Sequence, residues 1–301
     1  MSAFRLKARE SEAAGIRRVA HERIEDAVGR LRDRSADPAK AVHEARKDVK
    51  KLRSTLRLVR PVIGDSVYRR ENERFRDAAR ALSDARDTQV RAQTTEALGE
   101  RFADDPPPGG WAALRAAVAG GEQTASGELG RLREQAAAEI ERGDEEVERW
   151  PLGDDGFELL RPGLDRAYAR GRKSFRAARA EPTDEALHEF RKRSKDLWYH
   201  LRLLRTGWPQ VLEATAEQAH RLTDRLGDDH DLAVLGADLE RGFESLTAGQ
   251  RQHLRGLLER RRRELQGQAF GYAERLFAEK PKQFVRRIEA YWEAEKLLNA
   301  V

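Results

Sequence analysis

The chain contains no cysteine, a single methionine and few aromatic residues, which make up 7% of its 301 positions. The absence of cysteine excludes disulfides, thiol nucleophiles, iron–sulfur clusters and cysteine-ligated zinc sites. No apolar run of about 18 residues occurs, and the opening sequence MSAFRLKARESEAAG has no apolar core of the kind found in signal peptides. We therefore expect a cytoplasmic protein that does not enter a membrane.

Charged residues of both signs are abundant. Charged residues make up 37% of the chain, and 58 basic residues stand against 53 acidic ones, for a formal net charge of +5. Arginine outnumbers lysine about four to one, and the guanidinium fork suits phosphate oxygens. Alanine, leucine, arginine and glutamate dominate, a composition typical of long helices. The composition predicts an all-α protein.

Periodic apolar positions, interrupted by glycine and proline, predict the helices and a division into two halves. The break is the stretch GDEEVERWPLGDDG, residues 143–156, which predicts halves of residues 1–150 and 151–301. The helices of the two halves are expected at residues 9–33, 38–60, 66–83, 86–103 and 111–141, and at 157–179, 183–205, 209–226, 229–243, 247–278 and 281–298.

The two halves contain an internal repeat. A segment starting near Asp37 matches one starting near Glu181, with an offset of 145 residues across the matched pairs. The matched pairs are His43 with His188, Arg46 with Arg191, Lys47 with Lys192, Lys50 with Lys195, Leu52 with Leu197, Arg57 with Arg202 and Arg60 with Arg205. LSDARD at 82–87 similarly matches LGDDHD at 226–231. The repeat predicts two antiparallel helical bundles related by a pseudo-twofold axis.

Each repeated helix segregates its basic residues on one strip. At about 100° per residue, the first strip and a neighbouring apolar arc occupy separate faces of the helix, while Glu44 and Asp48 fall on a third face that we expect to be solvated. The first strip comprises His43, Arg46, Lys50, Arg53, Arg57 and Arg60. The second comprises His188, Arg191, Lys195, Arg202 and Arg205, with Lys192 and Tyr199 at its edge and Trp198 in the place of Arg53. Like charges at these spacings repel, so we expect either an external polyanion or carboxylates from neighbouring helices to offset them.

The two H-x-x-R-x-x-x-K motifs, together with LSDARD and LGDDHD, resemble the CHAD family, named for a conserved histidine α-helical domain. The resemblance implies two four-helix bundles around a basic central channel that binds inorganic polyphosphate. It makes His43, Arg46, Lys50, His188, Arg191 and Lys195 the central contacts, with Arg53, Arg57, Arg202 and Arg205 extending the channel and Lys47 and Lys192 flanking it. Arg60 and Tyr199, which lie on the strip and at its edge, are further candidate contacts. The first helix of each half adds weaker candidates: Arg17, Arg18, Arg166, Arg170, Arg172 and Lys173. The resemblance also suggests that the protein associates with cytoplasmic polyphosphate granules.

The motifs of common enzyme classes are missing, so we expect a binding protein and not an enzyme. There is no G-x-x-x-x-G-K-[ST] loop, G-x-S-x-G elbow, H-E-x-x-H helix or Glu-x-Glu-x-Lys motif. No cofactor and no metal site is expected, since the other five histidines show no ligand spacing. Two alternatives remain at this stage: a nucleic-acid-binding protein, and a helical scaffold whose charges pair internally.

Overall fold

The computed structural model describes residues 3–82, 84–119, 126–153, 156–241, 243 and 245–300, leaving out the side chains of 84–89, 119, 126, 127 and 300. Every regular element in these ranges is helical, which confirms the all-α prediction. The α-helices are α1 (Glu12–Arg32), α2 (Pro38–Ile63), α3 (Asp65–Arg80), α4 (Asp84–Arg101), α5 (Trp111–Ala119), α6 (Ser126–Glu141), α7 (Asp144–Val147), α8 (Arg161–Ala180), α9 (Asp184–Leu204), α10 (Pro209–Arg241), α11 (Ala248–Leu276) and α12 (Pro281–Ala300). Two 3₁₀ turns, η1 (Phe157–Leu159) and η2 (Arg205–Gly207), complete the set.

The two basic helices start at capped N-termini. The Asp37 side chain accepts a hydrogen bond from the backbone N–H of Lys40 at 2.8 Å, with Pro38 at the first helical position of α2. The Thr183 hydroxyl accepts from the N–H of Ala186 at 3.2 Å at the start of α9. Such side chains satisfy N–H groups that have no partner within the helix. The caps therefore set where each basic strip begins.

Three predicted helix boundaries were wrong. The predicted helix 111–141 consists of the separate helices α5 and α6, and the predicted helices 209–226 and 229–243 form the single helix α10. The gap expected between residues 226 and 229 contains Gly227, which lies inside α10, where a Cβ would come within 3.7 Å of the Arg191 guanidinium. Helix α2 also continues past Pro61 to Ile63, because a proline in the last turn interrupts little of the hydrogen-bond ladder.

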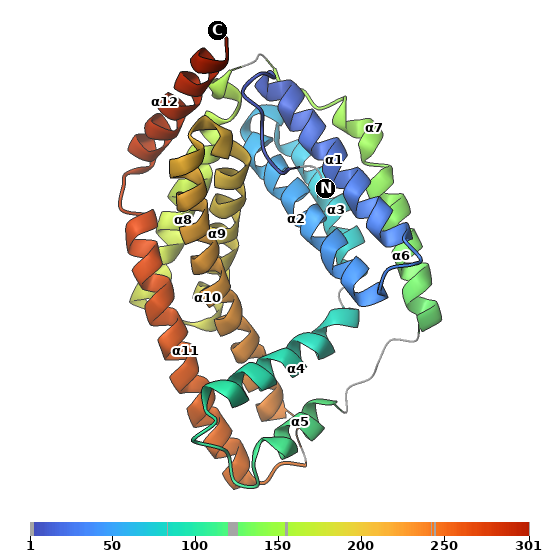
Figure 1. Ribbon diagram of the computed structural model, residues 1–301, viewed down its shortest axis with the longest axis vertical. Coiled ribbons are helices and arrows are strands. Elements are labelled where there is room, and N and C mark those ends of the chain that lie inside the picture. Colours follow the sequence, from blue (N-terminus) through green and yellow to red (C-terminus); the bar gives the residue numbers. More distant parts are fainter. Residues whose placement is uncertain are drawn as a thin grey trace.

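The helices form two groups of four that lie side by side (Figure 1). In the first group α1 packs on α2 and α6, and α3 packs on α2 and α6. In the second group the neighbours around the bundle are α8, α9, α10 and α11, with α12 packed on α8. Helix α2 contacts both α8 and α9, so the two basic helices meet where the groups join. The twofold relation between the halves stays a prediction.

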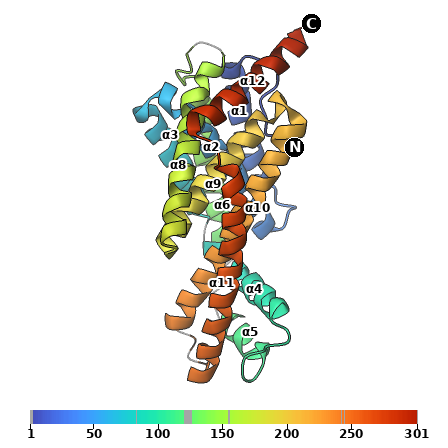
Figure 2. The ribbon, with the colours of Figure 1, turned by 90° about the vertical axis from the view of Figure 1, so that its left-hand side faces the viewer.

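A smaller core lies at the end of the molecule opposite the C-terminus (Figure 2). Here α4 of the first half packs against α10 and α11 of the second, and α5 packs on α4. Leu98 and Phe102 of α4 and Leu114 of α5 are buried with Leu235 of α10 and Leu257 of α11. Helix α4 thereby spans from the first group to the far end of the second (Figure 1).

Three polar contacts near the chain ends tie the groups together. The backbone N–H of Leu6 donates to the carbonyl of Leu203 at 2.8 Å, which attaches the N-terminal segment to α9. The buried carboxylate of Glu12 accepts from the Trp292 indole N–H at 2.7 Å and from Lys296 Nζ at 2.8 Å, which attaches α1 to α12. No helix in the described ranges combines the length and apolarity that crossing a bilayer requires.

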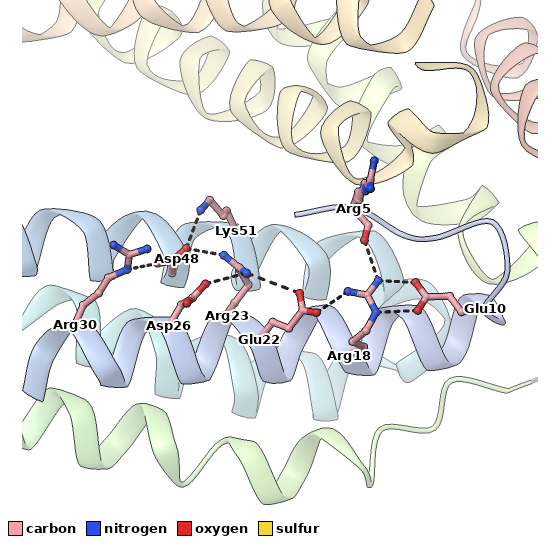
Figure 3. A network of polar contacts seen from close by, with 9 residues as sticks. All are labelled: Arg5, Glu10, Arg18, Glu22, Arg23, Asp26, Arg30, Asp48 and Lys51. Atoms are coloured by element: carbon pink, nitrogen blue, oxygen red, sulfur yellow. Dashed lines mark hydrogen bonds and ion pairs between the residues drawn. The ribbon is translucent and has the colours of Figure 1, made fainter. Parts of the chain in front are cut away.

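Asp48 does not lie on a solvated face, so that prediction was wrong. Its side chain is 1% exposed and lies within 3.1 Å of Arg23 Nη1, 2.8 Å of Arg30 Nε and 2.7 Å of Lys51 Nζ (Figure 3). Arg23 is equally buried, and its other Nη lies 2.9 Å from Asp26. A buried charge must be compensated by partners. The third face of α2 therefore forms an ion-pair network with α1.

Candidate functional site: a basic pocket

A pocket of about 470 Å³ lies between α2, α8 and α9. Ten of its lining residues are arginine or lysine, and Asp196 is the one carboxylate among those that line it. The basic residues are Lys50, Arg53, Arg57 and Arg60 from α2, Arg166 and Arg170 from α8, and Arg191, Lys192, Arg193 and Lys195 from α9. Such a concentration of one charge sign in a concave site focuses a positive potential toward any anion that enters.

The apolar arcs of the basic helices position these side chains. Val49, Leu52 and Leu56 of α2 are buried in the main core, as the sequence predicts, so the adjacent strip is held beside the packing seam. Helices α2 and α8 approach closely at Gly163, where a Cβ would overlap the carbonyl of Leu58. This close crossing brings the arginines of α8 over the strip of α2.

Carboxylates neutralise part of the pocket. Asp196 lies 3.0 Å from Arg57 Nη1 through one oxygen and 3.0 Å from Arg193 Nη1 through the other. Arg60 Nε donates to Asp65 at 2.8 Å, and its guanidinium lies 4.5 Å from the centre of the Tyr68 ring. These pairs orient the arginines and neutralise part of the positive charge of the strip. The internal-pairing alternative thus explains individual residues of the strip, but one lining carboxylate does not balance ten lining cations.

Two arginines show the electrostatic cost of this arrangement. Burial, assisted by the neighbouring Arg57, lowers the pKa of Arg53 to about 10, and its Nε donates to the uncharged Asn72 amide oxygen at 3.0 Å. Burial also lowers the pKa of Arg170, followed by repulsion from Arg193 and Arg166. Both guanidinium groups remain charged at pH 7. An anion in the pocket would relieve this repulsion.

A second pocket of about 300 Å³ continues from the first. Lys50 and Arg191 line both pockets, and the second adds Arg46, Arg91 and His230 together with Asp231. Arg46 Nη1 donates to the Leu82 carbonyl at 3.0 Å, and Arg91 Nε lies 2.8 Å from Asp238. The two pockets form one basic surface along facing parts of α2 and α9.

A family model of the CHAD domain matches residues 18–240 of the chain. The chain belongs to the CHAD family. The matched range contains α2, α9 and all the residues that line the two basic pockets, and it ends before α11 and α12. No curated protein matches this chain.

The two pockets of this CHAD domain include nine of the main predicted contacts. Seven from the repeated helices line the main pocket: Lys50, Arg53, Arg57, Arg60, Arg191, Lys192 and Lys195. Tyr199 joins them there, and Arg46 lines the second pocket. Two of the weaker candidates, Arg166 and Arg170, also line the main pocket. That makes eleven in all when the weaker candidates are included.

The remaining strip residues lie outside both pockets. His43 is 38% exposed beside Glu44, and the exposed Lys47 contacts the same carboxylate at 3.0 Å. The Arg202 guanidinium lies over the rings of Phe4 and Trp198, where burial lowers its pKa. Arg205 lies 3.6 Å from Glu213, and His188 packs on His230 with 5.0 Å between ring centres.

The other weaker candidates are engaged elsewhere in the CHAD domain. Arg17 donates to the Trp150 carbonyl at 3.1 Å, and Arg172 donates to the Phe277 carbonyl at 3.1 Å. Arg18 lies 2.8 Å from Glu22, and it also pairs with Glu10 (Figure 3). Lys173 is exposed and lines neither basic pocket. These side chains connect helices and chain segments or face solvent, so we leave them out of the proposed site.

The pocket residues that sequence reasoning missed include Arg193 and Asp196 in the first pocket, and Arg91 and His230 in the second. Glu189, Arg193 and Asp196 stand at i, i+4 and i+7, a helical charge pattern that could have been noticed. Arg91 reaches the pocket only because α4 packs on α10, which no local pattern shows. The side chains of Asp84 and Asp87 in LSDARD lie outside the described residues.

Proposed function

We propose that this CHAD domain binds inorganic polyphosphate in the main basic pocket and its continuation, without catalysis. The observation that carries the proposal is the lining of the main pocket, with ten arginines and lysines and one carboxylate around about 470 Å³. Membership of a family known for polyphosphate binding supports it. A linear polymer of phosphates has the repeated negative charges that a row of cations on two helices would match.

The contacts in the pocket suit such a polymer. Arginine forks can hold two phosphate oxygens at once, and lysine ammonium groups act as compact point charges. Asp196 keeps Arg57 and Arg193 extended through its two oxygens, so part of the binding surface is ordered before the ligand arrives. A preorganised site loses less conformational entropy on binding. We propose that the protein associates with polyphosphate granules of the cytoplasm, where this ligand accumulates.

Isothermal titration with long-chain polyphosphate tests the proposal. We expect binding at about 0.1 M salt, and a plot of log affinity against log salt with a slope steeper than about −3, because each neutralised phosphate releases condensed counterions. Absence of binding would refute the proposal. A short DNA duplex or an RNA of equal total charge serves as competitor. If it displaces polyphosphate charge for charge, the pocket is a general phosphate-backbone site and the nucleic-acid alternative is favoured.

We expect the pure protein to release no orthophosphate from long-chain polyphosphate in the presence of Mg²⁺ or Mn²⁺. The lining of the main pocket has one carboxylate, which is already engaged by two arginines, whereas metal-assisted hydrolysis uses several oxygen ligands and an activated water. A colorimetric phosphate assay over several hours measures this. Turnover that persists through repeated purification would show that the protein is an enzyme.

A further inference from the structure

Two histidines from different helices face each other at the second basic pocket. The rings of His188 on α9 and His230 on α10 have centres 5.0 Å apart and an angle of 42° between their planes. His230 lines the pocket together with Arg191, and His188 lies three residues before Arg191 on α9. The repeat aligns His230 with Arg86 of LSDARD. The second half therefore has a titratable imidazole where the first has a permanently charged guanidinium.

The charges around this pair come from five helices. They are Arg46 and Lys50 from α2, Arg91 from α4, Glu189, Arg191 and Lys192 from α9, Asp229 and Asp231 from α10, and Arg262 from α11. Two of the carboxylates are engaged with cations. Glu189 lies 2.6 Å from Arg193 and 3.1 Å from Lys192, and Asp229 lies 3.0 Å from Arg262. The cations of the pocket therefore dominate the field at the two rings.

Burial and this field both favour the neutral form of the two rings in the unliganded protein. Burial lowers the pKa of His188, followed by repulsion from Lys192 and Arg191. Burial also lowers the pKa of His230, followed by repulsion from Arg191 and from His188 itself. Two imidazolium ions 5.0 Å apart would repel, so the pair titrates as a unit.

We propose that the His188–His230 pair takes up a proton from solvent when polyphosphate occupies the second pocket, which makes binding proton-linked. The inference rests on the proposed function. Phosphates beside Lys50 and Arg191 would offset the cations that oppose an imidazolium, and the protonated ring would add one more charge-assisted contact to the polymer. Binding then favours protonation, and by linkage protonation favours binding to the same extent.

Proton-linked binding is tighter at lower pH. Binding raises the pKa of the pair, so the complex holds a proton that the unliganded protein lacks. Affinity therefore increases as pH falls through the interval between the higher pKa of the complex and the lower pKa of the unliganded protein. Log affinity changes by the proton uptake per pH unit, so for about 0.5 to 1 proton we expect affinity to rise roughly tenfold to a hundredfold between pH 8 and pH 6. Long chains are needed as the probe, because terminal phosphates, with a pKa near 6, are then a small share of the ligand charge.

Isothermal titration of the full chain with long-chain polyphosphate, in two buffers of different ionisation enthalpy at pH 7, counts the protons taken up. We expect about 0.5 to 1 proton per site for the wild type. The variant H188Q/H230Q should bind with little proton uptake. H230R, which restores the residue of the first half, should bind at pH 8 about as tightly as the wild type does at pH 6, with a flattened pH dependence.

Controls separate this inference from the proposed function. H253Q alters a histidine of α11 that lies near Asp105 and outside both basic pockets, and it should keep the full proton uptake. Polyphosphate binding without uptake by the wild type would overturn the proton link and leave the proposed function intact. Uptake that survives in H188Q/H230Q, or that disappears in H43Q alone, would overturn the assignment to this pair. Failure of the wild type to bind at all would instead refute the proposed function.

Discussion

Replacing Arg46, Lys50, Arg191 and Lys195 together by alanine is expected to lower the affinity for long-chain polyphosphate at least about 100-fold at about 0.1 M salt. All four line the basic pockets, and Lys50 and Arg191 line both. Each lost charge-assisted contact is worth about 1 kcal/mol or more. The change should also flatten the salt dependence, because fewer counterions are released. Titration calorimetry at several salt concentrations measures both effects.

A matched control removes four cations from elsewhere. Arg142, Arg149, Arg179 and Arg221 are each more than half exposed and pair with surface carboxylates. Their joint replacement by alanine changes the net charge equally but should reduce affinity only a few-fold. Circular dichroism should show unchanged helicity in both variants. If the pocket variant unfolds while the control does not, the four residues are structural ion pairs and not ligand contacts.

The second large effect concerns stability. Asp48→Ala is expected to lower the free energy of unfolding by about 3–5 kcal/mol, because it leaves the buried Arg23 without this partner and also removes the anion beside Arg30 and Lys51. Urea unfolding followed by circular dichroism measures the change. Polyphosphate affinity of the folded fraction should change little, since Asp48 lines neither basic pocket.

Neighbouring substitutions provide the comparison for Asp48. Glu44→Ala, four residues earlier on α2, removes a carboxylate that pairs with the exposed Lys47, and it should cost less than about 1 kcal/mol. The double variant R23M/D48L replaces the buried pair by apolar side chains and should be closer to the wild type than Asp48→Ala alone. A loss below about 1 kcal/mol for Asp48→Ala would mean that water reaches the network.

Helical class, the repeat and the basic strips could be predicted because they depend on local spacing. The apolar arc of α2 is buried as expected, since a period of 3.6 residues places Val49, Leu52 and Leu56 on one face. The same local reasoning failed at Gly227. A glycine inside a helix costs about 1 kcal/mol relative to alanine, and packing along α10 outweighs that cost.

Residue spacing along the chain specifies an all-α protein with two matched helices, each carrying a strip of cations beside an apolar arc. Which cations share a pocket depends on how the helices pack, since α8 and α4 bring Arg166 and Arg91 to strips that lie far away in the chain. Helix packing also buries Asp48 with Arg23 and brings His188 to face His230. The physical reason is that helix periodicity orders side chains around one axis, whereas charge pairing and pKa depend on the neighbours that a second helix supplies.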